Sequence, residues 1–140
     1  MKNIYISSHD YTRLRMLASA RAAGKGHAAA AAQKLLRELD RAIMLAHHEL
    51  PPRVVRIGSR VTIEDLESGE TEAYVLTWPD QANAGHGRLS VLAPIGTALL
   101  GYTEGDELEW DTPGGLRRLR ILAVDLENAT ATRPVLETVS

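Results

Sequence analysis

The chain has 140 residues, enough for one ordinary domain or for a small domain with an appendage. Apolar residues make up 44% and charged residues 24%, a globular balance that argues against wholesale disorder. There is no cysteine, which excludes disulfides, thiol nucleophiles and cysteine-ligated metal sites. No apolar run is long enough to cross a membrane and no signal-like segment opens the chain, so we expect a cytoplasmic protein.

The net charge of −2 conceals an asymmetry between the two parts of the chain. Residues 1–52 carry eight basic and four acidic side chains, whereas residues 53–140 carry eight basic and fourteen acidic ones. Such an asymmetry either orients a partner electrostatically or reflects two ordinary solvated surfaces, and charge alone does not decide between them.

The first fifty residues predict an antiparallel helical hairpin, because they are rich in alanine, leucine and arginine. Ser7 and Asp10 have the spacing of a capping box at the start of the first helix. Gly24 and Gly26 supply the turn, and a second helix begins near Ala28. Its apolar stripe continues to about residue 50 through Leu35, Leu36, Leu39, Ala42, Ile43, Ala46 and Leu50. The narrow stripes favour a thin, projecting coiled coil over a hairpin folded down onto a core, and both fit the pattern.

Beyond Pro51-Pro52, β-branched residues and glycine-marked turns predict a β domain. One short helical turn is expected at residues 97–100, between Gly96 and Gly101. The fold class is therefore α+β, with a helical hairpin over residues 1–50 and a β domain over residues 53–140. The expected strands are residues 54–57, 60–66, 71–78, 88–93, 107–110 and 116–124.

The residue patterns by themselves do not predict an active site. The five histidines lack metalloprotease spacing, and the chain has neither a phosphate-binding P-loop nor a nucleophile elbow. Acidic clusters at Glu64-Asp65 and residues 106–111 are typical of solvated strand faces. The basic cluster Arg117-Arg118-x-Arg120 is more typical of a charged strand edge than of a nucleic-acid groove. We therefore expect a binding protein without catalytic residues, metal or cofactor.

A segment of the β domain resembles the C-terminal signature of the GreA/GreB transcript-cleavage factors. It reads GRLSVLAPIGTALLG over residues 87–101 and is followed by Gly105-Asp106-Glu107. Upstream, IGSRVTIEDLESGE over residues 57–70 is similar to a hairpin of that family, and Pro113-Gly114-Gly115 is similar to one of its turns. The resemblance covers about residues 54–124 and implies an FKBP-like body, a twisted antiparallel sheet wrapped against one short helix.

The N-terminal half resembles that family only in the type of structure expected, an antiparallel helical hairpin. Gre factors carry an antiparallel coiled coil that enters the secondary channel of bacterial RNA polymerase, where acidic tip residues help to hold a catalytic magnesium ion. Here the hairpin is shorter, and its tip at Gly24, Lys25, Gly26 and His27 has no acid. A short hairpin on a Gre-like body resembles Rnk, the family named regulator of nucleoside diphosphate kinase, which binds RNA polymerase without Gre-type cleavage.

The resemblance implies a transcription regulator that docks on the rim of the secondary channel through Ala93, Pro94, Ile95 and Gly96. Ala93 stands where Gre factors usually have serine. Such a protein would compete with Gre-type factors without stimulating cleavage and would meet nucleic acid only through the polymerase. We expect no cofactor and no membrane partner. The sequence favours a monomer but leaves the oligomeric state open, since an exposed apolar stripe of the hairpin could pair with a second copy. Two alternatives stay open. One is a peptidyl-prolyl isomerase-like enzyme, which the scarcity of aromatic residues disfavours, and the other is an interaction module for another protein such as nucleoside diphosphate kinase.

Overall fold

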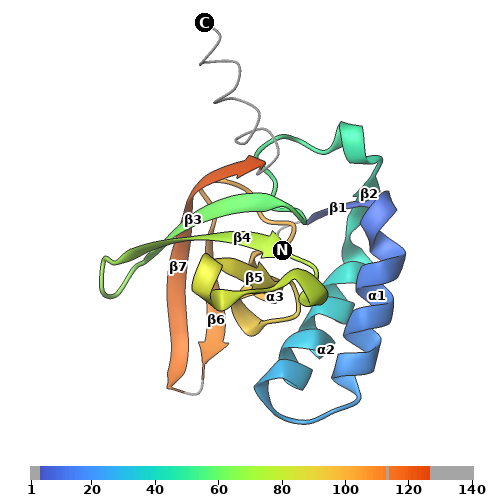
Figure 1. The fold of residues 1–140 in the computed structure, drawn as a ribbon, viewed down its shortest axis with the longest axis horizontal. Helices are drawn as coiled ribbons and strands as arrows, with labels where there is room; N and C mark the ends of the chain where they lie inside the picture. The colour runs from blue at the N-terminus through green and yellow to red at the C-terminus, as the bar shows by residue number, and fades with distance from the viewer. Residues whose placement is uncertain (1–3, 113, 127–140) are drawn as a thin grey trace, which may run out of the picture.

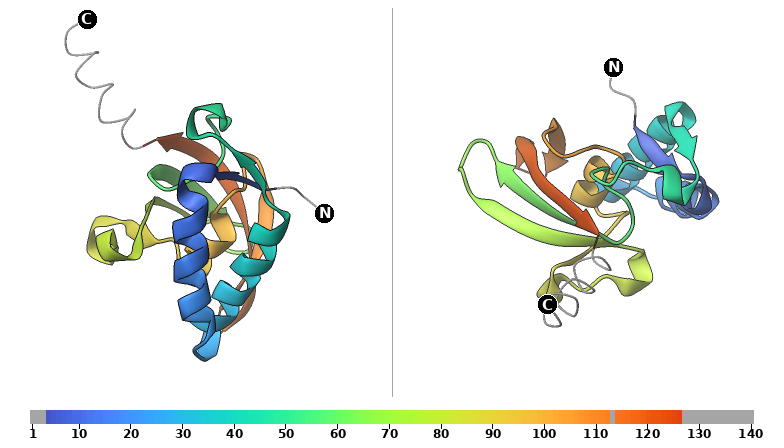
Figure 2. Two further views of the ribbon diagram at one scale, coloured as in Figure 1. Left: turned by 90° about the vertical axis from the view of Figure 1, so that its right-hand side faces the viewer. Right: turned by 90° about the horizontal axis from the view of Figure 1, so that it is seen from above.

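The computed structural model describes residues 4–112 and 114–126, and it arranges them in three layers (Figures 1 and 2). A five-stranded sheet forms the first layer. The short helix α3 (Pro94–Leu99) forms the second, and the hairpin of α1 (Ser8–Ala22) and α2 (Gly26–Arg41) forms the third. The view from above in Figure 2 places α3 between the sheet and the hairpin. The helical N-terminal part and the C-terminal sheet confirm the predicted α+β class.

The sheet has the strand order β5-β4-β3-β7-β6, so that β3 lies at its centre. Four of the predicted strands are confirmed within a few residues. Their observed bounds are β3 (Ser59–Asp65), β4 (Thr71–Thr77), β6 (Glu107–Thr112) and β7 (Gly115–Leu126). Three strand pairs are antiparallel, but β5 (Arg88–Ser90) runs parallel to β4. This parallel pair corrects the expectation of a wholly antiparallel sheet, because the segment between the two strands crosses over through two 3-10 turns, η2 (Pro79–Gln81) and η3 (Ala84–His86).

Two further strand predictions are wrong in whole or in part. The predicted strand at residues 54–57 is an irregular segment in which residues 54–56 are buried, because the Arg56 N–H donates to Ser59 Oγ at 2.9 Å and the chain turns there. The predicted strand at residues 88–93 ends at Ser90, where the Ala93 N–H turns back to the Ser90 carbonyl at 3.0 Å. The helix α3 consequently begins at Pro94, earlier than expected.

The two predicted helices are confirmed, but the second is shorter than its apolar stripe suggests. Ser7 caps α1 by accepting a hydrogen bond from the His9 N–H at 3.2 Å. α2 ends at Arg41, and the residues after it form β2 (Ile43–Leu45) and the 3-10 turn η1 (His47–Glu49). β2 pairs in parallel with β1 (Tyr5–Ser7), and the Ile43 N–H donates to the Ile4 carbonyl at 2.9 Å. This long-range pairing outweighs the local helical pattern.

The expectation of a projecting hairpin is wrong. The buried stripe of α2 consists of Ala29, Ala32, Leu35 and Leu39, and much of it belongs to the same hydrophobic cluster as residues of α3 and the sheet. The turn between α1 and α2 lies at the same end of the molecule as the turn between β6 and β7 (Figure 1). The hairpin therefore lies along the body with α3 beneath it. Coiled-coil packing, an FKBP-like body and a domain boundary near residue 50 stay predictions. Among the described residues, no helix is long and apolar enough to cross a bilayer.

Candidate functional site

The loop predicted to dock is held rigidly at the start of α3. Ala93 has an extended backbone and accepts a hydrogen bond from the Thr97 N–H at 2.8 Å. The Thr97 hydroxyl in turn donates to the Val91 carbonyl at 2.8 Å. Pro94 occupies the first turn of the helix, where its missing N–H costs nothing. Ala93, Pro94 and Ile95 are half-buried, so they form a fixed and partly exposed edge.

Gly96 differs from the other three residues of this loop because it is buried. A β-carbon placed on Gly96 would lie 2.2 Å from the Ser90 carbonyl oxygen. The glycine is therefore required for the close approach of α3 to β5, and its local role is in packing.

Ile95 lines a small cavity between α3 and the sheet, which we name the Ile95 pocket. Its volume is about 190 Å³. Apolar side chains from β3 and β7 line it together with two aromatic rings from β4 and β6 and three carboxylates beside the β3–β4 turn. These residues are Ile63, Asp65, Glu70, Glu72, Tyr74, Ile95, Trp110 and Leu119. The pocket combines an apolar interior with an acidic rim.

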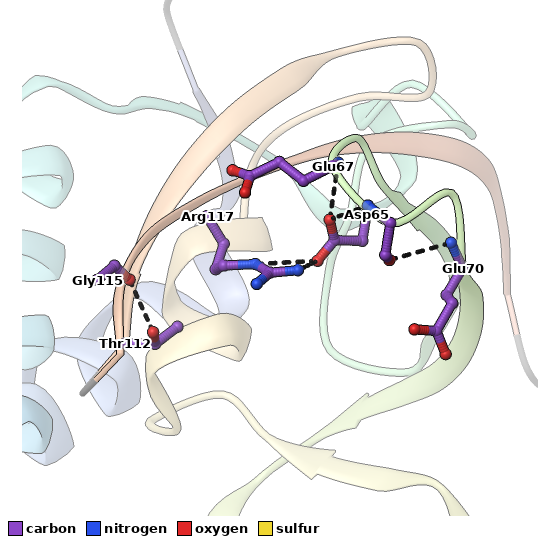
Figure 3. A network of polar contacts seen from close by, with 7 residues as sticks. Asp65, Glu67, Glu70, Thr112, Gly115 and Arg117 are labelled. Atoms are coloured by element: carbon purple, nitrogen blue, oxygen red, sulfur yellow. Dashed lines mark hydrogen bonds and ion pairs between the residues drawn. The ribbon is translucent and has the colours of Figure 1, made fainter.

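Polar contacts fix the rim of the Ile95 pocket (Figure 3). One Asp65 oxygen accepts hydrogen bonds from Arg117 at 2.5 and 3.1 Å, and the other accepts from the Glu67 N–H at 2.9 Å. The Arg117 contact, with the backbone donors of the turn, holds the pKa of Asp65 below its usual value. Across the pocket the Tyr74 hydroxyl donates to Glu72, and burial together with this carboxylate raises the pKa of Tyr74 to about 12. Asp65 is paired with Arg117, and the other two lining carboxylates, Glu70 and Glu72, leave the rim with net negative charge.

The predicted tip residues Gly24, Lys25, Gly26 and His27 are all exposed at the turn of the hairpin. The chain has no acidic residue between Asp10 and Glu38, so the outer part of the hairpin offers no carboxylate to a cation. In the part of the chain that the structure describes, no three histidine or carboxylate side chains gather as a metal site.

The structure brings one tip residue and one loop residue together, because His27 and Pro94 line the same groove between α2 and α3. Sequence reasoning missed the aromatic residues Tyr74 and Trp110. Their signal was present in the alternation of strand residues, which places Tyr74 on the same face as Glu72 and Trp110 on the same face as Leu108. Without the strand order, that alternation could not show that both rings line one pocket with Ile95.

Both parts of the chain match models of known protein families. Residues 50–126 match the family model for the C-terminal part of transcription elongation factor GreA/GreB, which is more than half of the chain. The chain belongs to the GreA/GreB family. Residues 2–45 match a second model, that of the Rnk N-terminus, and this segment contains both helices of the hairpin.

Two curated relatives and one solved structure agree with this assignment. The Escherichia coli protein named regulator of nucleoside diphosphate kinase is 39% identical over 101 residues, which cover 71% of this chain and 74% of that protein. A GreA from Nitratidesulfovibrio vulgaris is 47% identical over 75 residues, or 54% of this chain and 47% of that protein. The solved GreA/GreB transcription elongation factor from Nitrosomonas europaea has a TM-score of 0.70 and 36% identity, covering 89% of this chain and 99% of that one.

Within the GreA/GreB family, this chain therefore combines an N-terminal segment that matches the Rnk N-terminus with a GreA/GreB C-terminal part. It spans about half the length of the GreA relative, while it covers most of the E. coli regulator. The protein is a Gre-like regulator whose relatives are named as transcription factors and regulators.

Proposed function

We propose that this Gre-like regulator binds RNA polymerase at the rim of the secondary channel, competes there with Gre-type factors and does not stimulate transcript cleavage. The observation that carries the proposal is the pairing of a rigid loop at Ala93–Ile95 with the Ile95 pocket beside it. An apolar side chain of the partner can reach Ile95 and Trp110, while the acidic rim favours a basic neighbour on that partner. The contribution of Gly96 is indirect, because it allows the loop to lie close to Ser90.

Charge and reach support the proposal that the protein does not stimulate cleavage. The sequence between Asp10 and Glu38 contains six basic residues and no acidic one, and Lys25 at the tip would repel a divalent cation. The hairpin also lies along the body, and its tip lies at the same end of the molecule as the end of β6 in Figure 1. The protein would thus act by occupying its docking surface, and it would not deliver carboxylates to a distant active centre.

The binding half of the proposal is tested by co-sedimentation or gel filtration with core RNA polymerase at low salt. The wild-type protein should travel with the polymerase, and Ile95→Ala should weaken the complex by removing the apolar anchor. Met16→Ala is the matched control, because Met16 is a 68% exposed apolar residue on α1, away from the Ile95 pocket. Absence of wild-type binding, or equal binding of Ile95→Ala and wild type, would contradict the proposal.

The second half is tested on backtracked elongation complexes. Added alone, the protein should leave the cleavage rate at its intrinsic value, and added with a GreA it should lower the GreA-stimulated rate as its concentration rises. Stimulation of cleavage by the protein itself would contradict our interpretation of the tip. Undiminished GreA activity at saturating protein would show that the two do not share a docking surface.

A second candidate function is supported by one relative, whose name describes regulation of nucleoside diphosphate kinase. In that case the same exposed loop would serve a protein other than polymerase. A parallel binding experiment with purified nucleoside diphosphate kinase separates the candidates, since Ile95→Ala should affect whichever complex uses the loop. The isomerase alternative gains an aromatic-lined pocket from the structure, and a proline-peptide assay showing the uncatalysed rate would exclude it.

A further inference from the structure

A second and larger groove lies between α2 and the body, adjoining the Ile95 pocket through Trp110, which lines both. On the α2 side it is lined by His27, Ala30, Ala31, Lys34 and Arg37. The spacing of these residues is that of a single helix face, and the small alanines leave a hollow between longer basic side chains. We name this cavity the α2 groove.

The opposite wall of the α2 groove is mostly apolar. Pro94, Thr97 and Ala98 come from α3, and the β6–β7 hairpin supplies Trp110 and Leu116. Leu116 is 56% exposed, unusually open for a leucine, and the ring of Trp110 is half-buried. The volume of the groove is about 340 Å³. A typical small-molecule site has roughly 300–1,000 Å³, so the hollow suits a compact ligand better than a folded partner.

The described lining of the α2 groove carries two cationic side chains, Lys34 and Arg37, against one carboxylate. Lys34 and Arg37 are exposed, and neither has an ion-pair or hydrogen-bond partner among the described residues. Arg13 and Arg15 of the same hairpin are engaged instead, by Asp80 at 3.5 Å and by Asp40 at 2.8 Å. Glu109 is the one carboxylate among the described lining residues, and the β6–β7 register places it opposite Arg118.

We propose that the α2 groove binds a mononucleotide, with its phosphates at Lys34 and Arg37 and its base against Trp110. Guanidinium and ammonium groups are the usual protein partners of phosphate, and an exposed indole face is a stacking surface for any base. Charge and aromatic surface thus lie on facing walls of one cavity of suitable size. The proposed nucleotide site shares Trp110 with the Ile95 pocket and Pro94 with the docking loop. Its phosphate-binding side chains Lys34 and Arg37 line only the α2 groove, so variants at these two positions test nucleotide binding separately from docking on polymerase.

The chain offers its own reporter for this site, because it has two tryptophans and Trp78 lies outside the groove. In a Trp78→Phe background, titration with ADP should change the Trp110 fluorescence and saturate at concentrations on the order of 1 mM or below. Adenosine and inorganic pyrophosphate should each bind about fivefold or more weakly, since each retains one of the two interactions. Adenosine or pyrophosphate binding as tightly as ADP, or no saturable change, would overturn the proposal.

Charge variants give the decisive comparison. Lys34→Gln combined with Arg37→Gln should weaken ADP binding about tenfold, whereas Arg21→Gln, an exposed cation of α1 outside the groove, should leave it unchanged. Glu109→Gln should tighten binding, because it removes the carboxylate that opposes the phosphates. Circular dichroism checks that each variant is folded. An unchanged ADP curve in the double variant, or an acidic peptide that binds as tightly as ADP, would contradict a nucleotide site.

Discussion

The Tyr102 hydroxyl donates a hydrogen bond of 3.2 Å to the Glu38 carboxylate, and this contact joins the body to α2. Glu38 is only 6% exposed although it is an acidic residue. Backbone contacts hold Tyr102 on both sides, since its N–H donates to the Leu99 carbonyl at 3.1 Å and its carbonyl accepts from the Val55 N–H at 2.8 Å. The hairpin is thus fixed against the body by a polar contact as well as by its apolar stripe.

Replacing Tyr102 with phenylalanine should destabilise the protein by about 1–3 kcal/mol, because the buried Glu38 carboxylate loses its donor. Urea unfolding followed by circular dichroism measures the change. In a Glu38→Leu background the same substitution should cost much less, since no carboxylate is then left without a partner. If Tyr102→Phe lowered the free energy of unfolding equally in the wild-type and Glu38→Leu backgrounds, the Tyr102–Glu38 hydrogen bond would not link the hairpin to the body.

The same tyrosine predicts a loss of stability at alkaline pH. Burial, followed by the charge and hydrogen bond of Glu38, raises the pKa of Tyr102 from 10.0 to about 12. Its contribution is fully present below pH 10 and is lost as pH rises toward 12, because the unfolded chain releases the proton first. Stability should fall over this interval, and less steeply in Tyr102→Phe. An equally steep fall in the stability of both proteins would contradict the assignment of this pH dependence to Tyr102.

Gly96→Ala should destabilise the protein by about 2 kcal/mol or more, because the new methyl group would lie 2.2 Å from the Ser90 carbonyl oxygen. Thermal unfolding measures this effect. The matched control is Gly85→Ala, where the nearest described atom lies at 3.4 Å and can move with the Asn83 side chain. If Gly96→Ala kept full stability and lost only polymerase binding, Gly96 would be a contact residue after all.

The order of secondary structure could be predicted from the sequence wherever local signals act alone. Gly69 in the β3–β4 turn and the alternation within β3 and β4 agree with the final sheet, so these strands were found within a residue or so. The pairing of β1 with β2 could not be predicted, since each has three residues and Ile43 also fits the helical stripe. The orientation of the hairpin likewise depends on contacts between distant residues such as Tyr102 and Glu38.

The candidate site was predicted in part. Motif resemblance identified the loop at Ala93–Gly96, but it could not separate the packing role of Gly96 from the exposed edge at Ile95. The sequence does not indicate Trp110, because a lone tryptophan in an acidic strand gives no local sign that two cavities will form around it. Its importance arises from the position of β6 at the sheet edge beside α3.

A buried arginine holds the segment that leads from the hairpin into the sheet. Arg56 is 5% exposed, and its guanidinium donates to the Pro51 carbonyl at 2.6 Å and to the Leu50 and His47 carbonyls at 3.4 Å. Burial lowers the pKa of Arg56, and the nearby charge of Asp10 partly offsets this effect. Several backbone acceptors between β2 and β3 therefore depend on this one side chain.

Arg56→Met should destabilise the protein by about 3 kcal/mol, because methionine fills similar space but leaves these carbonyls without their donor. Arg60→Met on β3 removes the same charge from an exposed position and should change stability by less than about 0.5 kcal/mol. Hydrogen exchange adds a local measurement, since amides in residues 47–50 should lose protection in Arg56→Met before those of β3. Equal stability of the two variants would mean that solvent replaces the guanidinium at no cost, and the segment after β2 would then owe its position to apolar packing alone.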